Sequence, residues 1–181
     1  VQWKKVVTHK KFRQFPIFIP FHNHTEGGFL NSYPCNVNLG QIIDMTSTVM
    51  YTGDLRTTCT HLQSQSAFET DAPVDNNGKG ERFSPTDLMA TSLAACMITV
   101  MGIKARTMGF DLNDIRIDVL KIMKADPRRV GGINLTFFIP GSLKDIDEKT
   151  KAILKNTGET CPVIKSIHPD IEVKIDWGNW S

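Results

Sequence analysis

Two of the four cysteines, Cys96 and Cys161, have surroundings suited to redox chemistry. A thiolate can attack a peroxide oxygen and become a sulfenic acid, and a second cysteine can condense with it to a disulfide. Cys161 precedes Pro162 at an expected helix start, where the helix dipole predicts a thiol pKa below the free value of about 8.5. Cys96 lies in an apolar segment, where a single cysteine is most often a small core side chain. Redox chemistry and core packing therefore both stay open, and a reactive thiolate would need a cation from elsewhere in the chain.

Cys96 lies in the segment 84–109, which predicts a long helix. Ser84 suits the N-cap, and Asp87, three residues further on, completes a capping-box pattern. No charged residue occurs over 88–103, so the helix has no polar face to meet water and other elements must surround it. The segment is somewhat short for a membrane span. We therefore expect a buried central helix.

The rest of the chain predicts an α+β domain with one core. Alternating apolar and polar residues predict an antiparallel meander over 46–71 and a hairpin over 115–139. An amphipathic helix, which Gly158 is expected to cap, is predicted over 146–156, and a strand over 171–177. A short helix is expected between these last two elements. The order is meander, buried helix, hairpin, two helices and a strand.

Composition argues against several functional classes. The net charge is +2, and residues 45–181 carry 16 of the 21 basic and 17 of the 19 acidic residues. No basic stripe therefore predicts binding to nucleic acid or to a membrane surface. Four cysteines without a C-x-x-C pair are too sparse for a disulfide scaffold and favour a reducing, cytoplasmic setting. Cys59 and His61 share one side of a strand, but no second pair completes a metal site, and we expect no metal.

Residues 1–44 show no sustained helical or strand period. Prolines interrupt their apolar run, which argues against a signal peptide. Two interpretations stay open. In one, Met45 is the natural start and the earlier residues come from an over-long reading frame; in the other, they form an ordinary flexible extension. We place the main domain at 45–181.

Two motifs resemble those of the OsmC/Ohr family of thiol peroxidases. They are Ser84-Pro85-Thr86-Asp87-Leu88 leading to Ala94-Ala95-Cys96, and Thr160-Cys161-Pro162-Val163. The resemblance implies an OsmC-like fold, in which antiparallel sheets pack around a long central helix in an intertwined homodimer. It implies that Cys96 is the peroxidatic cysteine and Cys161 the resolving one. It also implies reduction of organic hydroperoxides by a dithiol, without metal or flavin.

The chain departs from this family at Thr86. Strongly active members have a glutamate there, which positions a catalytic arginine, and threonine cannot form that ion pair. Asp87 and Glu81 are the carboxylates that could replace it, and Arg56 is the nearest counterpart of the arginine. One hypothesis is a peroxidase in which Arg56 stabilises the thiolate. The other is a small-molecule-binding or structural protein of the same fold with little peroxidase activity. The two differ in whether any carboxylate reaches Arg56.

Overall fold

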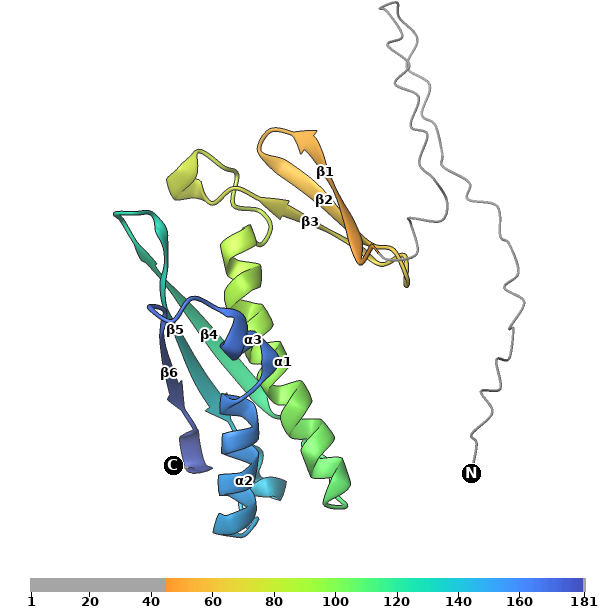
Figure 1. Ribbon diagram of the computed structural model, residues 1–181, viewed down its shortest axis with the longest axis vertical. Coiled ribbons are helices and arrows are strands. Elements are labelled where there is room, and N and C mark those ends of the chain that lie inside the picture. The colour runs from red at the N-terminus through yellow and green to blue at the C-terminus, as the bar shows by residue number, and fades with distance from the viewer. Residues whose placement is uncertain (1–44, 181) are drawn as a thin grey trace, which may run out of the picture. The chain divides into compact units, whose positions relative to one another are not determined.

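The computed structural model describes residues 45–180, so the predictions for residues 1–44 lie outside it (Figure 1). The regular elements are β1 (Ser47–Gly53), β2 (Arg56–His61), β3 (Ala67–Asp71), α1 (Pro85–Thr107), β4 (Arg116–Lys124), β5 (Arg129–Phe138), α2 (Glu148–Glu159), α3 (Pro162–Ser166) and β6 (Glu172–Asp176). This order confirms the predicted α+β class.

The first sheet is the predicted antiparallel meander, with the strand order β1-β2-β3. The turn from β1 to β2 is tight, and its central residues Asp54 and Leu55 have φ angles of 51° and 59°. This turn starts β2 at Arg56, and the register between β2 and β3 pairs Arg56 directly with Asp71. Residues paired in this way have neighbouring side chains. The meander therefore places a cation beside a carboxylate.

The second sheet has the strand order β4-β5-β6, with β4 antiparallel and β6 parallel to β5. The expectation that both sheets are antiparallel is therefore wrong for this one, because the two helices between β5 and β6 return the chain to the starting end of β5. Alternate residues of β5, namely Ile133, Leu135 and Phe137, are buried, as expected for one covered face. The helices α1, α2 and α3 lie over that face (Figure 1), and α1 packs against β4, β5, α2 and α3. The hydrophobic core of the described residues lies between this sheet and the helices.

Helix α1 has the predicted N-terminus. Ser84 is the N-cap: its Oγ accepts a hydrogen bond from the Asp87 N–H, and the Asp87 carboxylate accepts one from the Ser84 N–H. This reciprocal pair satisfies two backbone donors that the helix itself cannot pair. The 23-residue helix that follows, 85–107, confirms the predicted central helix.

The expectation that α1 is surrounded on all sides is wrong within a single chain. Only about a third of its most apolar 18-residue stretch is buried. The buried part lies on the side that meets the second sheet and the other two helices. Ser92, Ala95, Thr99 and Ile103 lie exposed on the opposite side. The helix α1 is long and apolar enough to cross a membrane, but the core helices of soluble proteins can have the same length and composition. One chain thus leaves an uncharged helix face uncovered.

Two details of α2 differ from the prediction. The helix begins after Asp147, which caps it by accepting the Thr150 N–H, so Ile146 lies outside it. Gly158 does not cap the helix but lies inside it, packed against α1. A Cβ at Gly158 would lie 2.9 Å from the Met101 sulfur, so this glycine serves the close approach of the two helices.

Candidate functional site

The structure brings Cys96 and Cys161 together where α1 meets α3. Cys96 is half-buried on the flank of α1, whereas Cys161 is 1% exposed and belongs to the core. Cys161 is the N-cap of α3, and its sulfur accepts the N–H of Ile164 at 3.5 Å. The Cys96 thiol is close enough to influence the ionisation of Cys161. Two thiols from distant parts of the chain are therefore neighbours.

The predicted effect of the helix start on Cys161 is wrong in direction. Burial raises the pKa of the Cys161 thiol, because the charged form loses water, and the neighbouring Cys96 thiol raises it further. The backbone N–H groups of Ile164 and Val163 act in the opposite direction but do not outweigh burial. The Cys161 thiol consequently holds its proton more tightly than a free cysteine does.

Arg56 is held by two carboxylates. Its Nε and Nη2 donate to the two Asp71 carboxylate oxygens at 2.6 and 2.9 Å, a bidentate pair, and Nη2 also donates to Glu81 Oε2 at 2.8 Å. These hydrogen bonds raise the pKa of Arg56, and the one from Arg56 lowers the pKa of Asp71. Two carboxylates thus reach Arg56: that of Glu81, one of the two predicted candidates, and that of Asp71, which was not predicted for this role.

Asp71 also anchors the loop that leads into α1. Its side chain is 2% exposed, and its Oδ2 accepts the backbone N–H of Glu81 at 3.1 Å. The backbone N–H of Asp71 donates to the carbonyl of Phe83. Inside the loop, a Cβ at Gly78 would lie 1.7 Å from the Ala72 carbonyl oxygen, so only glycine fits there. Arg56, Asp71 and the loop 72–83 form one connected unit at the start of α1.

Asp87, the other predicted candidate, pairs with a different cation. Lys121 Nζ lies 2.6 Å from Asp87 Oδ1, 2.9 Å from Thr86 Oγ1 and 3.4 Å from Ser84 Oγ. Burial acts to raise the pKa of Asp87, but hydrogen bonds from Lys121 and Ser84 outweigh it, and the pKa is lowered. Thr86, the position at which the resemblance noted above implies a glutamate, thus contacts a lysine in this chain.

Sequence reasoning missed Lys121, although the strand alternation contained a signal. Lys121 occupies the same phase of β4 as Val119 and Met123, whose side chains pack toward the core. A lysine at an inward position of a strand needs a partner for its charge. Such a lysine therefore indicated a carboxylate on the element that covers β4.

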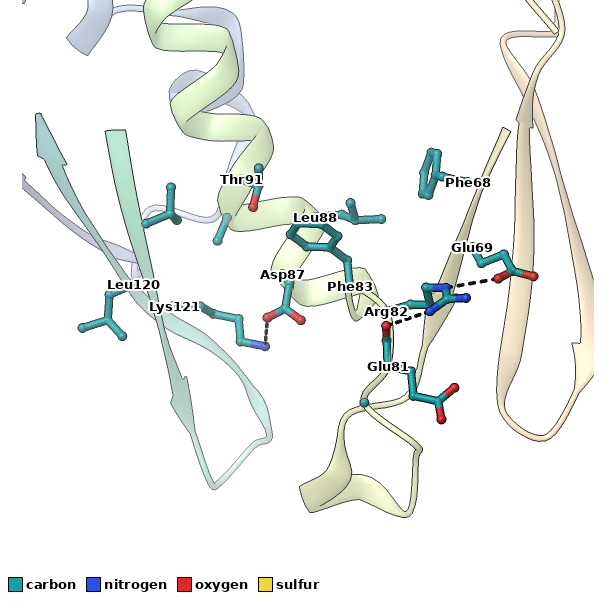
Figure 2. A pocket seen from close by; sticks show the side chains of 13 residues that line it. Phe68, Glu69, Glu81, Arg82, Phe83, Asp87, Leu88, Thr91, Leu120 and Lys121 are labelled. Atoms are coloured by element: carbon teal, nitrogen blue, oxygen red, sulfur yellow. Dashed lines mark hydrogen bonds and ion pairs between the residues drawn. The ribbon is translucent and has the colours of Figure 1, made fainter. Parts of the chain in front are cut away.

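A pocket of about 890 Å³ adjoins the Lys121–Asp87 pair. Figure 2 shows Phe68 and Phe83 in its wall, with the Lys121–Asp87 ion pair at one end and the Arg82–Glu69 ion pair at the other. Its volume falls in the range of small-molecule sites, and its lining is mainly apolar with a few charged groups. Neither Cys96 nor Cys161 lines this pocket.

The structure does not bring Arg56 to the cysteines within one chain. Its guanidinium contacts Asp71 and Glu81, at the loop that precedes α1. Cys96 lies ten residues after Thr86 on the same helix, which corresponds to about 15 Å along the axis. Within residues 45–180, no lysine or arginine forms a hydrogen bond with either sulfur. Cys96 and Cys161 are therefore neighbours, whereas Arg56, the third predicted site residue, is not next to either of them.

The family model described as OsmC-like protein matches residues 78–176, the part that contains α1 and both cysteines. The chain belongs to the OsmC-like family. It is 55% identical to a protein of known structure from Psychrobacter arcticus, described as an osmotic-stress-induced and detoxification-response protein. That match has a TM-score of 0.69 and covers 73% of this chain and 94% of the other.

More distant OsmC-like proteins share the fold. An organic hydroperoxide resistance protein from Legionella pneumophila is 20% identical, with a TM-score of 0.56 over 73% of this chain and 96% of its own. An OsmC-like protein from Mycoplasma pneumoniae is 17% identical, with a TM-score of 0.58 over 72% of this chain and 92% of its own. No curated protein matches the chain. These likenesses confirm the predicted OsmC-like fold of the single chain.

Proposed function

We propose that this protein is a thiol-dependent peroxidase that reduces organic hydroperoxides. The observation that carries the proposal is the proximity of Cys96 and Cys161, one half-buried and one fully buried, at the contact of α1 with α3. Neighbouring thiols can pass from sulfenic acid to disulfide without a metal or another cofactor. The Legionella relative is described as an organic hydroperoxide resistance protein, which supports this substrate class.

The two cysteines take different roles. The Cys96 thiolate attacks one oxygen of the hydroperoxide, the O–O bond breaks, and the alcohol leaves after it gains a proton. Cys96 is then a sulfenic acid. Cys161 attacks that sulfur, water leaves, and a disulfide joins the two residues. A dithiol returns both cysteines to the reduced state. The greater exposure of Cys96 supports this assignment, because an external substrate must reach the first sulfur.

Arg56 supplies the cation for this chemistry, with Glu81 in the role of the missing family glutamate. The bidentate bond to Asp71 and the bond to Glu81 hold the guanidinium in one orientation. Because Arg56 lies far from Cys96 along α1, we place it at the Cys96 of a second copy of the chain. The site is then complete only in a homodimer.

Two uncovered surfaces support the homodimer. One is the uncharged outer face of α1, on which Ile103 is 61% exposed. The other is β1, where consecutive residues Val49, Met50 and Tyr51 are each about two-thirds exposed. Apolar side chains on both faces of one strand are typical of a protein interface. The cytoplasm, a reducing setting, suits an enzyme that returns to free thiols after each cycle.

The first experiment is to mix the reduced protein with cumene hydroperoxide and follow intact mass and free thiols. We expect the loss of two hydrogens and a disulfide between Cys96 and Cys161. Cys96→Ser and Cys161→Ser should each abolish that disulfide, whereas Cys59→Ser should keep it. An unchanged mass under a large excess of peroxide would contradict the proposal.

The apolar pocket favours a second candidate, a small-molecule-binding protein of the OsmC fold. Its volume of about 890 Å³ could hold a ligand, and Lys121 rather than an arginine contacts Thr86. This candidate predicts normal folding and unreactive thiols in the same experiment. An unchanged mass would therefore favour the small-molecule-binding function over the peroxidase.

A further inference from the structure

We propose that the reducing dithiol attacks the Cys96 sulfur of the Cys96–Cys161 disulfide, from the side by which the hydroperoxide reaches Cys96. Cys161 is then the leaving thiol. This inference rests on the proposed function, because it requires that disulfide. It specifies which sulfur the reductant attacks in the second half of the catalytic cycle. It also implies that the hydroperoxide and the dithiol reach Cys96 by the same route, one after the other.

The first argument is access. Cys161 is 1% exposed within the core, whereas Cys96 packs against the edge of that core and is half-buried. The Cys161 sulfur is also turned toward the Ile164 N–H at the start of α3. Thiol–disulfide exchange needs contact between the entering sulfur and the sulfur that it attacks. Attack on Cys161 would therefore require the start of α3 to open first.

The second argument is the geometry of displacement at sulfur, in which the entering and leaving atoms lie on opposite sides. When Cys161 attacks the sulfenic acid, the oxygen leaves from the side of Cys96 that faces away from Cys161. A thiolate that later displaces Cys161 from Cys96 enters from that same side. The hydroperoxide oxygen has already reached this position, so the approach is open to an external molecule.

The pKa of the leaving thiol does not reverse the preference for attack on Cys96 over attack on Cys161. A thiol of lower pKa leaves faster, and burial raises the pKa of Cys161, which disfavours its departure. With a Brønsted slope of about 0.5, however, two pKa units change the rate only about tenfold. A buried sulfur reacts only in the fraction of molecules that are locally open. The Ile164 N–H also faces the departing sulfur and stabilises its negative charge.

The electrons balance in two steps. One thiolate of the dithiol bonds to the Cys96 sulfur, and the Cys96–Cys161 bond breaks with its electron pair on Cys161, which takes a proton from water. The second thiolate of the dithiol then attacks its own partner sulfur and releases Cys96 as a thiolate. The dithiol becomes a cyclic disulfide, and its two electrons have reduced the protein.

The test uses the full chain with Cys35→Ser and Cys59→Ser, so that only Cys96 and Cys161 remain. Diamide forms the disulfide without any peroxide, and cysteamine, a small monothiol, then opens it under native conditions. Acid quenching, alkylation of the released thiol with iodoacetamide and peptide mass mapping locate both groups. We expect cysteamine on Cys96 and the alkyl group on Cys161. The same reaction in urea should place cysteamine on either residue, which shows that both adducts are detectable.

Each outcome decides a separate point. Cysteamine on Cys161 under native conditions would overturn this inference and leave the proposed function intact, as would a disulfide that opens only in urea. If diamide and cumene hydroperoxide both fail to form the disulfide, the proposed function falls as well. Single-cysteine variants give an independent measure: Cys161 alone should react with Ellman's reagent at least about tenfold more slowly than Cys96 alone. Equal rates would contradict the access argument.

Discussion

Glu81 places a carboxylate oxygen 2.8 Å from Nη2 of Arg56, although it lies five residues before Thr86, the position at which the OsmC/Ohr resemblance implies a glutamate. The carboxylate therefore reaches the arginine from the loop rather than from the helix. This arrangement is possible because buried Asp71 holds both the guanidinium and the Glu81 backbone. The threonine at position 86 is therefore compatible with an arginine held in place by carboxylates.

We expect Glu81→Gln to slow the reaction of Cys96 with cumene hydroperoxide about tenfold, because the amide no longer orients the Arg56 charge. Glu81 is 59% exposed, so the free energy of unfolding should change by less than about 1 kcal/mol. Glu69→Gln is the matched control, since Glu69 pairs with Arg82 on the same surface. Stopped-flow measurement of thiol oxidation gives both rates. Equal rates for Glu81→Gln and the wild type would remove Glu81 from the site.

Asp71→Asn should lower the free energy of unfolding by about 2 kcal/mol. The Asp71 side chain is 2% exposed and accepts two hydrogen bonds from Arg56 and one from the loop backbone. An amide group can accept only at its oxygen and leaves a charged donor less well satisfied. Urea unfolding followed by circular dichroism measures the change. A loss below about 0.5 kcal/mol would show that water replaces the carboxylate without cost.

The stability that Asp71 contributes should depend on pH in a defined direction. The pKa of Asp71 is lowered in the folded protein, so the unfolded chain binds its proton first as the pH falls. The contribution is fully present above the unfolded pKa of about 3.9 and disappears as the pH falls through the lower folded pKa. Urea midpoints for the wild type and Asp71→Asn should therefore converge as the pH falls below about 4. If the difference between the two urea midpoints stayed constant over this pH range, the destabilisation would come from packing rather than from the charge of Asp71.

Lys121→Met should destabilise the start of α1, because it leaves Asp87 and Thr86 without their cation. The side chain of Lys121 is 18% exposed, and we expect a loss of about 1–2 kcal/mol. Lys124→Met on the same strand is the control, since Lys124 is exposed. Lys121→Arg should restore part of the loss. If both methionine variants unfold at the same urea concentration, the ion pair contributes nothing measurable.

Ile103→Glu should convert a dimer to a monomer that remains folded. Ile103 is 61% exposed within one chain and lies on the uncharged outer face of α1, so a carboxylate there opposes burial against a second copy. Lys149→Glu, on the exposed side of α2, should leave the assembly intact. Sedimentation velocity reports the mass, and circular dichroism reports the fold. If the wild-type protein sediments as a monomer, a second copy cannot contribute Arg56 to the proposed site.

Most elements could be predicted because their signals are local. The capping pattern of Ser84 and Asp87 starts α1, and the alternation in 115–139 specifies the hairpin. The errors arose where a distant segment decides the outcome. Gly158 suggests a helix end, but it is selected for contact with Met101, more than fifty residues earlier. The helix start at Cys161 predicts a lower pKa, but burial by the assembled core reverses the shift.

The candidate site was predicted only in part for the same reason. The cysteine pair could be proposed from its motifs, and Arg56 and Glu81 could be named as candidates. Their actual partners depend on which strands lie side by side. The pairing of β2 with β3 places Asp71 beside Arg56, and the position of α1 over β4 places Asp87 beside Lys121. The alternation of β4 indicates that Lys121 needs a carboxylate partner, but no single segment of the sequence identifies which carboxylate meets Lys121 or Arg56.

The uncovered face of α1 has a consequence for how this protein would behave at different abundances. If the reactive site needs residues from two copies, the fraction of complete sites follows mass action and falls when the protein is diluted. Activity per molecule would then rise with total protein concentration and reach a plateau. A cell that makes more of the protein would gain more than a proportional increase in the number of complete sites. The affinity of this helix surface for a second copy would thus set the protein concentration at which most sites become complete.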